Sequence, residues 1–214
     1  PRPAFSRHVL TLTLILVVAA VVRQININQS LWYDELYSLV HFVFRTPLGV
    51  LTTYSAPNNH IGYTLLARLA IDPAQGTEVG FRIPSLVFGL VGVVAVYFLG
   101  LQLAGRTIAL LAGAVMALHP WATSAAQEAR GYSAMMALTA LSTALLIRAL
   151  DLKRNGSWLG VIVCNVTVAF IHPFSMFVIW GQQISAYLAT LARPQPKGDR
   201  TILMAQVTAV YLLT

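Results

Sequence analysis

The sequence predicts an all-α membrane protein, a polytopic bundle of transmembrane helices. Hydrophobic residues make up 57% of the 214 residues and charged residues only 10%, and the mean hydropathy is +0.70. Soluble domains carry roughly 25% charged residues, so this composition excludes a soluble domain, a disordered chain, a fibrous repeat and a disulfide scaffold. The apolar residues lie in long runs, whereas the strands of a transmembrane barrel alternate between apolar and polar residues.

Seven apolar runs can form spans, because a transmembrane helix needs about 20 predominantly apolar residues. Arg23, near the end of the first run, can snorkel to the interface. The last run begins a seventh span, and we expect the chain to be the N-terminal part of a longer protein. The spans are expected at about 8–25, 83–104, 107–119, 127–150, 156–171, 174–192 and 201–214.

The distribution of charge indicates how the spans are oriented. With the N-terminus in the cytoplasm, nine of the 14 Lys and Arg residues lie on the cytoplasmic side, as the positive-inside rule favours. The net charge of +7 then reflects topology and contact with anionic lipid headgroups. The stripe of basic and aromatic residues that binds nucleic acid is missing from the sequence, so we expect membrane lipids and no nucleic acid as partners. The nine residues are Arg2, Arg7, Arg106, Arg148, Lys153, Arg154, Arg193, Lys197 and Arg200.

A long loop at residues 26–81 separates the first two spans and is expected on the outer side of the membrane. Two amphipathic helices are predicted in it, Asp34–Arg45 and Ile61–Ile71, the second capped by Asn59. Helices of this kind lie in the membrane interface. Together, the loop and the spans are expected to form a single module over residues 1–214. In the first helix the apolar stripe is Leu36, Leu39, Val40 and Val43, and the polar stripe is Asp34, Ser38, His41 and Arg45.

The segment Ser30–Glu35 places two adjacent carboxylates soon after the first span. Asp34 and Glu35 can be solvated acids that open a helix, where the helix dipole favours negative charge. They can also be catalytic, because acids are scarce in this chain and a partly shielded carboxylate at the bilayer surface can serve as a general base. Both interpretations stay open at this point.

Three other polar residues lie at the outer ends of the predicted elements. Arg130, in the segment Gln127–Tyr132, can form an anion site at a helix N-terminus or snorkel to headgroups. Arg82 can hold a phosphate or pair with Glu78, four residues earlier. His60 can be a metal ligand, a donor to phosphate or an ordinary loop histidine, and no pair of Cys or His at zinc spacing supports a metal site.

Four motifs follow one another in a specific order, and this order resembles that of the GT-C glycosyltransferases of the protein-O-mannosyltransferase and aminoarabinose-transferase type. Those polytopic enzymes have a long first outside loop with an acidic motif just after the first span and two interface helices. The motifs are LWYDELYS at Leu31–Ser38, NNHIGYTLLARL at Asn58–Leu69, FRIPSLVFGL at Phe81–Leu90 and HPWATSAAQEARGYSAMMAL at His119–Leu138.

The resemblance implies an inverting membrane glycosyltransferase. Such an enzyme takes a sugar from a polyprenyl-phosphate carrier and gives it to a hydroxyl on the extracytoplasmic face. Asp34 matches the acidic residue of the family and would be the general base, and Glu35 would assist or orient it. The acceptor would be a lipid, a glycan or a protein, and the enzyme would be integral to a bacterial inner or plasma membrane.

The resemblance also implies which residues bind the substrate. Arg82 and Arg130 would neutralise the phosphate as it leaves, with Tyr132 alongside. His60 falls where members of the family place polar residues of the donor site or of a metal site, so a divalent metal is the one cofactor that the resemblance leaves open.

The chain departs from the family in two ways, and the second departure supports another hypothesis. Many relatives carry prolines after the position of His60, where this chain has Ile61-Gly62, and the family's usual C-terminal part is missing from this sequence. The alternative is a non-catalytic GT-C-like membrane subunit or scaffold, recruited by partners into a larger membrane complex.

Overall fold

The computed structural model describes residues 3–53, 59–71, 77–152 and 155–192. These residues form helices joined by turns and contain no β-strand, which confirms the all-α fold class. The expected seventh span, 201–214, lies outside them. The helices are α1 (Pro3–Gln24), α2 (Tyr33–Ser38), the π-helical turn η1 (Leu39–Val43), α3 (Pro47–Thr52), α4 (Ile61–Ala70), α5 (Thr77–Leu118), α6 (Pro120–Gln127), α7 (Tyr132–Leu152), α8 (Asn155–Ile171) and α9 (Ser175–Ala192).

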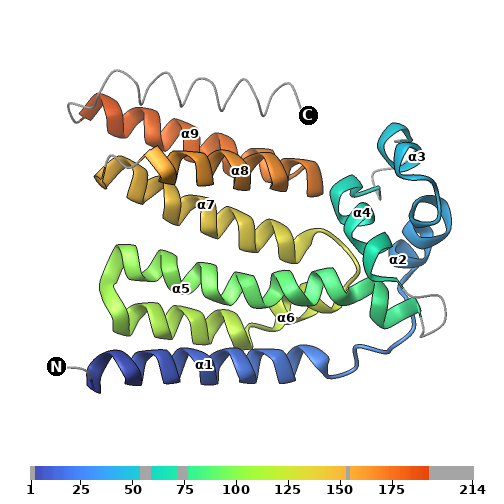
Figure 1. The fold of residues 1–214 in the computed structure, drawn as a ribbon, viewed down its shortest axis with the longest axis horizontal. Coiled ribbons are helices and arrows are strands. Elements are labelled where there is room, and N and C mark those ends of the chain that lie inside the picture. The colour runs from blue at the N-terminus through green and yellow to red at the C-terminus, as the bar shows by residue number, and fades with distance from the viewer. Residues whose placement is uncertain (1–2, 54–58, 72–76, 153–154, 193–214) are drawn as a thin grey trace.

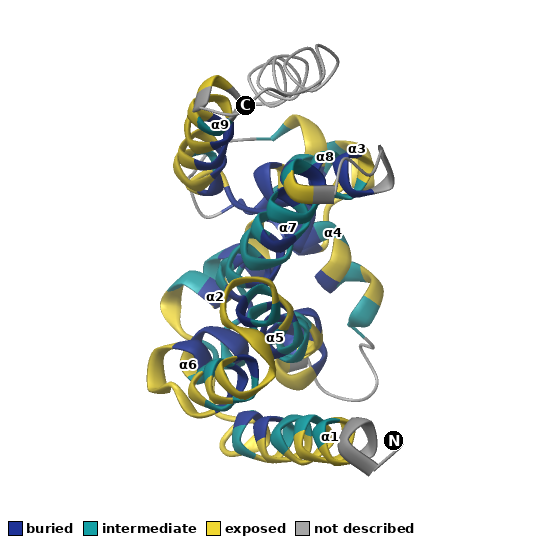
Figure 2. Ribbon diagram, turned by 90° about the vertical axis from the view of Figure 1, so that its left-hand side faces the viewer, coloured by how far each residue is buried: buried dark blue, intermediate teal, exposed yellow. Residues whose placement is uncertain are grey.

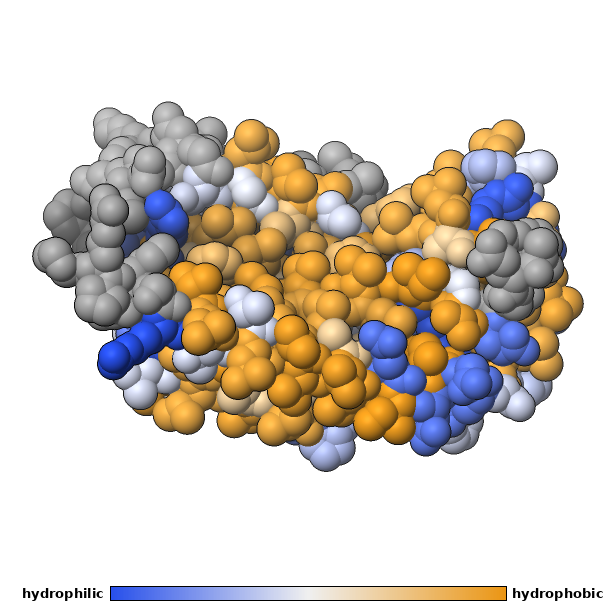
Figure 3. Space-filling view, turned by 60° about the horizontal axis from the view of Figure 1, so that its bottom comes forward, coloured by the Kyte–Doolittle hydropathy of each residue, from blue (hydrophilic) through white to orange (hydrophobic). Residues whose placement is uncertain are grey.

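The long helices lie side by side, and the short helices gather at one end of the bundle (Figure 1). Among the described residues, three helical segments are long and apolar enough to cross a membrane, namely Arg7–Gln24, Glu78–Leu118 and Tyr132–Asp151. Residues on the outer faces of α1 and α9 are exposed, whereas residues on the faces toward the interior of the bundle are buried (Figure 2). One face of the molecule shows an apolar band over the long helices with hydrophilic residues towards the ends (Figure 3), as expected of a protein surrounded by lipid.

Helix α5 is a helical hairpin. Its 42 residues would extend about 63 Å if straight, twice the thickness of a hydrocarbon core. Gly105 breaks it with φ 80° and ψ −176°, a conformation that glycine adopts at little cost. The arms 77–104 and 106–118 then run back along each other (Figure 1). The two arms pack closely because Gly100 has no side chain. A Cβ at this position would lie only 2.9 Å from the Ala109 Cα.

Arg23 does not snorkel to the interface, contrary to the sequence-based expectation. Its side chain is fully buried, and its guanidinium donates hydrogen bonds to the carbonyls of Ala117 at 2.8 Å and Met116 at 3.1 Å. These carbonyls belong to the last turn of α5, which has no partners within its own helix. Arg23 therefore caps the second arm of α5 and joins it to α1.

The first predicted interface helix is present as α2 followed by η1, but its predicted faces are partly wrong. Leu39 and Val43 are buried as expected, whereas Leu36 and Val40 are 49% and 62% exposed. Ser38, assigned to the polar stripe, is buried. The π-helical turn accounts for part of the difference, because its wider spacing shifts the face that meets the core.

The second predicted interface helix, α4, begins with His60 as its N-cap and not with Asn59. The Asn59 side chain instead donates to the carbonyls of Val50 and Thr53 and accepts a hydrogen bond from the Thr64 hydroxyl. Asn59 thus joins α3 to α4.

The largest core cluster among the described residues lies toward the end of the bundle where the short helices gather. It forms where α4, α5, α7 and α8 meet, and its buried members include Tyr63, Phe81, Leu138 and Ile171. The Tyr63 hydroxyl donates to the Phe81 carbonyl at 2.7 Å. Because this core fixes the beginnings of α5 and α7, it also fixes the turn that precedes α7.

Candidate active site

A carboxylate and a guanidinium meet at the end of the bundle where the short helices gather. Arg130 Nη1 donates to Asp34 Oδ2 at 2.7 Å. The Asp34 side chain is 43% exposed and that of Arg130 is 18% exposed, so both are within reach of a ligand from solvent or from the membrane surface. Asp34 lies in the first turn of α2, where a negative charge is stabilised by the helix dipole.

Arg130 lies in a turn two residues before α7, whereas the expected span 127–150 would have placed it within a helix. Helix α6 ends at Gln127, Glu128 has extended backbone angles, and α7 begins at Tyr132. Residues 128–131 therefore connect the two helices. The Arg130 guanidinium lies over the Tyr132 ring, 4.9 Å from its centroid, a cation–π contact that orients the cation.

Glu35 and Arg82 form a second, fully buried ion pair behind the first. Arg82 Nη2 and Nε donate to the two carboxylate oxygens of Glu35 at 2.6 and 3.0 Å. This bidentate geometry is the strongest form of the interaction. The partner of Arg82 is thus Glu35, 47 positions away, and not Glu78 as one interpretation of the sequence had it.

The remaining donors of Arg82 are also occupied. Its Nη1 donates to the carbonyls of Ile27 and Gln29, each at 2.7 Å, and its Nη2 to the carbonyl of Ser30 at 3.3 Å. A guanidinium has five N–H donors, and all five are used. In this arrangement Arg82 organises the segment that leads into α2 and has no donor left for a phosphate.

Glu35 holds together the two segments that carry the exposed pair. Its Oε2 accepts from the Trp32 backbone N–H at 2.9 Å, which caps α2, and its Oε1 accepts from the Ala129 N–H at 2.6 Å. Ser85 on α5 adds a further contact, with its hydroxyl 2.5 Å from the Glu128 carbonyl. Since Asp34 is next to Glu35 and Arg130 is next to Ala129, these hydrogen bonds determine where the exposed pair lies.

An aromatic cluster adjoins Arg130 on its other side. The His60 and His172 rings are 4.5 Å apart, and Tyr132 lies 4.9 Å from His172. His60 Nδ1 accepts a hydrogen bond from the Gly131 N–H at 3.3 Å, so His60 also fixes the 128–131 turn. His172 follows the last residue of α8, and only its contacts identify it as a neighbour of the site.

Burial keeps both histidines neutral. Desolvation, together with the nearby His172 and the positive charge of Arg130, lowers the pKa of His60 to about 3. Desolvation and the charge of Arg130 lower the pKa of His172 to about 4. At neutral pH both imidazole rings are therefore uncharged.

The two imidazoles do not amount to a complete metal site. In the part of the chain that the structure describes, no three His, Cys, Asp or Glu side chains come together as ligands. Zinc sites use three or four protein ligands, and the described residues bring no such set together. A divalent metal stays a prediction.

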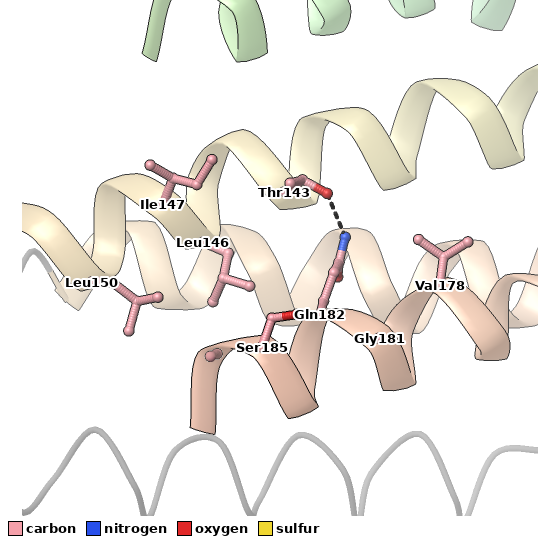
Figure 4. A pocket seen from close by; sticks show the side chains of 9 residues that line it. Thr143, Leu146, Ile147, Leu150, Val178, Gly181, Gln182 and Ser185 are labelled. Atoms are coloured by element: carbon pink, nitrogen blue, oxygen red, sulfur yellow. Dashed lines mark hydrogen bonds between the residues drawn. The ribbon is translucent and has the colours of Figure 1, made fainter. Parts of the chain in front are cut away.

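A small cavity opens beside the exposed pair. It measures about 140 Å³ and is lined by Trp32, Asp34, Glu35, Glu128 and Arg130. A second cavity, of about 450 Å³, lies between α7 and α9. There Gln182 reaches across to α7 and donates to the Thr143 hydroxyl at 2.7 Å (Figure 4). Thr143 follows Arg130 by 13 residues, about 20 Å along a helix, so this cavity is remote from the ion pairs.

Comparison with known proteins places the chain in a family. No curated protein and no solved structure matches it. The family model of the dolichyl-phosphate-mannose-protein mannosyltransferases matches residues 61–213. The match includes Arg82, Arg130 and Tyr132 and begins after Asp34, Glu35 and His60. It confirms the resemblance to membrane glycosyltransferases of the GT-C type, and the chain belongs to the dolichyl-phosphate-mannose-protein mannosyltransferase family.

Proposed function

We propose that the site around Asp34 and Arg130 transfers a sugar from a polyprenyl-phosphate donor to an acceptor hydroxyl, with inversion at the sugar carbon. The reaction takes place on the extracytoplasmic side, and the N-terminus lies in the cytoplasm. The observation that carries this proposal is the solvent-accessible carboxylate held 2.7 Å from a guanidinium. Transfer from a phosphate carrier needs one base and one cation, and this pair supplies both.

Asp34 is the general base. Its carboxylate takes the proton from the acceptor hydroxyl while the acceptor oxygen bonds to the anomeric carbon. The bond between that carbon and the phosphate oxygen breaks on the opposite face, and its electron pair leaves with the polyprenyl phosphate. A positioned base of this kind contributes typically 10²- to 10⁴-fold in rate.

Arg130 is the phosphate-binding cation, and Tyr132 supports it. Negative charge grows on the phosphate oxygen as the bond to the sugar breaks, and a positioned guanidinium stabilises this charge. The leaving phosphate then needs no proton. The Tyr132 ring beneath the guanidinium keeps the cation in place, and His60 holds the turn through the Gly131 N–H.

Glu35 and Arg82 are positioning residues in this proposal. Their hydrogen bonds are saturated by one another and by backbone groups. We therefore assign to Arg82 a role in holding the Asp34 segment, in place of the phosphate contact that the resemblance implied. Rigid support of this type determines whether a catalytic pair keeps its productive geometry.

The acceptor is a hydroxyl of a lipid, a glycan or a protein, and the donor sugar is presented from the membrane. The test is sugar transfer by the full-length protein in liposomes containing polyprenyl-phosphate mannose, with a panel of hydroxyl acceptors. Asp34→Asn is expected to lower kcat by at least about 100-fold. The matched control is Asp151→Asn, which removes an exposed acid at the far end of α7, and it should transfer at the wild-type rate. Full activity of Asp34→Asn would exclude Asp34 as the base.

A further inference from the structure

The proposed base and the proposed phosphate-binding cation are bonded to each other. Arg130 Nη1 lies 2.7 Å from Asp34 Oδ2. While this bond lasts, one carboxylate oxygen of Asp34 is occupied by the guanidinium, and the charge of Arg130 is balanced by a resident anion. A donor phosphate that approaches Arg130 therefore meets a site that already contains a carboxylate.

We propose that Asp34 and the donor phosphate compete for Arg130, so that arrival of the donor releases the Asp34 carboxylate to act on the acceptor. The inference rests on the function proposed above. It adds an order to the reaction, because the acceptor is activated only after the donor has bound. It also explains how the product is released, since the returning carboxylate displaces polyprenyl phosphate from Arg130.

The burial of the two ion pairs supports this competition. Both carboxylates of the acidic motif face an arginine, but the Glu35–Arg82 pair is 0–1% exposed whereas the Asp34–Arg130 pair is 43% and 18% exposed. Exposed pairs contribute little to stability and exchange readily, whereas breaking a buried pair is strongly unfavourable. The exposed pair is therefore the one that a ligand can open.

The chemistry of the donor phosphate also supports its competition with Asp34 for Arg130. A phosphate presents several charged oxygens to a planar guanidinium and can bind it bidentately, which is stronger than a single contact. The structure places one hydrogen bond between Arg130 and Asp34. Phosphate therefore displaces the carboxylate without any need for the backbone to move, because the buried bonds of Glu35 to Trp32 and Ala129 stay in place.

Binding of the carrier without its sugar tests the proposal independently of catalysis. The probe is polyprenyl monophosphate, and its Kd is measured with the purified full-length protein in nanodiscs at fixed ionic strength, because screening affects both contacts. Asp34→Asn keeps the shape of the side chain and removes the competing charge. It is expected to bind the carrier about three- to tenfold more tightly than wild type, even though it is inactive in transfer.

Glu128→Gln is the matched control. Glu128 lines the same cavity, but its carboxylate accepts from the Ser124 hydroxyl at 3.2 Å and makes no ion pair with Arg130 among the described residues. Its Kd should change by less than about twofold. An equal gain in both variants would overturn the competition, because the effect would then be a general loss of negative charge.

Three further outcomes decide whether Asp34 and the donor phosphate compete for Arg130. In an Arg130→Gln background the Asp34→Asn change should leave the Kd unaltered, since the contested cation is gone, and a persisting gain would overturn the proposal. Unchanged or weaker binding by Asp34→Asn in the wild-type background would overturn it too, while leaving the transferase assignment intact. Failure of the wild-type protein to bind the carrier at all would overturn both.

Discussion

The Glu35 carboxylate accepts a hydrogen bond at 2.6 Å from the backbone N–H of Ala129, which lies 94 positions further along the chain. The bond is buried, and it joins the start of α2 to the turn between α6 and α7. Each of the two residues is adjacent to one member of the exposed pair Asp34–Arg130. The exposed site is therefore supported by a buried hydrogen bond immediately behind it.

This arrangement predicts that loss of either buried partner destabilises the protein strongly. Glu35→Gln leaves the fully buried Arg82 without its counter-charge, and removing one partner of a buried ion pair typically costs about 3–5 kcal/mol. We expect a fall of several degrees in the apparent Tm in detergent. Glu78→Gln, which changes an exposed acid at the start of α5, is the control and should leave the Tm unchanged.

Arg130→Ala is predicted to weaken the interaction with the donor. Loss of a charged hydrogen-bond partner is worth about 1.5–3 kcal/mol, which corresponds to a rise of roughly tenfold to hundredfold in the KM for polyprenyl-phosphate mannose. The KM for the acceptor should change little. Arg106→Ala, an exposed arginine next to the bend of α5, serves as the control, and a donor KM that is equal in the two variants would argue against a phosphate role for Arg130.

Gly105→Ala is predicted to destabilise the α5 hairpin. The space around a Cβ at this position is open, so the cost comes from the positive φ of 80° alone. A β-carbon at such a backbone angle typically costs about 1 kcal/mol or more. The apparent Tm should fall, whereas Gly181→Ala, at a glycine of α9 that also has open space and lies within a helix, should raise it or leave it unchanged.

The protein is predicted to lose stability as the pH falls from about 6.5 to 4. The pKa values of His60 and His172 are lowered in the folded state to about 3 and 4, while an unfolded chain protonates histidine near pH 6.5. Within this window the unfolded state binds protons that the folded state does not, so unfolding becomes more favourable as the pH falls. Apparent Tm measured from pH 7.5 to 4.5 should show this decline, and His172→Phe should make it shallower. A decline of the same slope in the variant would show that His172 is not responsible.

The sequence predicted the fold class because long apolar runs and scarce charge leave few alternatives to membrane helices. The bend at Gly105 lies between two of the expected spans, where a glycine precedes Arg106 in an otherwise apolar stretch. The resemblance implied that Asp34 and Arg130 serve the same reaction, and the two side chains lie 2.7 Å apart in the structure. Their roles in transfer remain predictions.

Long-range partners could not be read from the sequence. The Glu35–Arg82 pair joins residues 47 positions apart, and helical periodicity instead pointed to Glu78, one turn away. Arg23 appeared to be a snorkelling residue because the sequence does not show that the last carbonyls of α5 lie beside it. The turn at residues 128–131 lies within the expected span 127–150, because sequence periodicity did not show that the helix begins only at Tyr132.

The central claim, that Asp34 is the base of a sugar transfer, is tested most directly by a single turnover. Full-length protein is loaded with saturating polyprenyl-phosphate mannose, the acceptor is added, and the rate of transfer is measured for wild type and for Asp34→Asn. Saturation removes any difference in donor affinity, so the rate reports on the chemical step. The variant should be slower by at least about 100-fold, and a rate within threefold of the wild type would contradict the account.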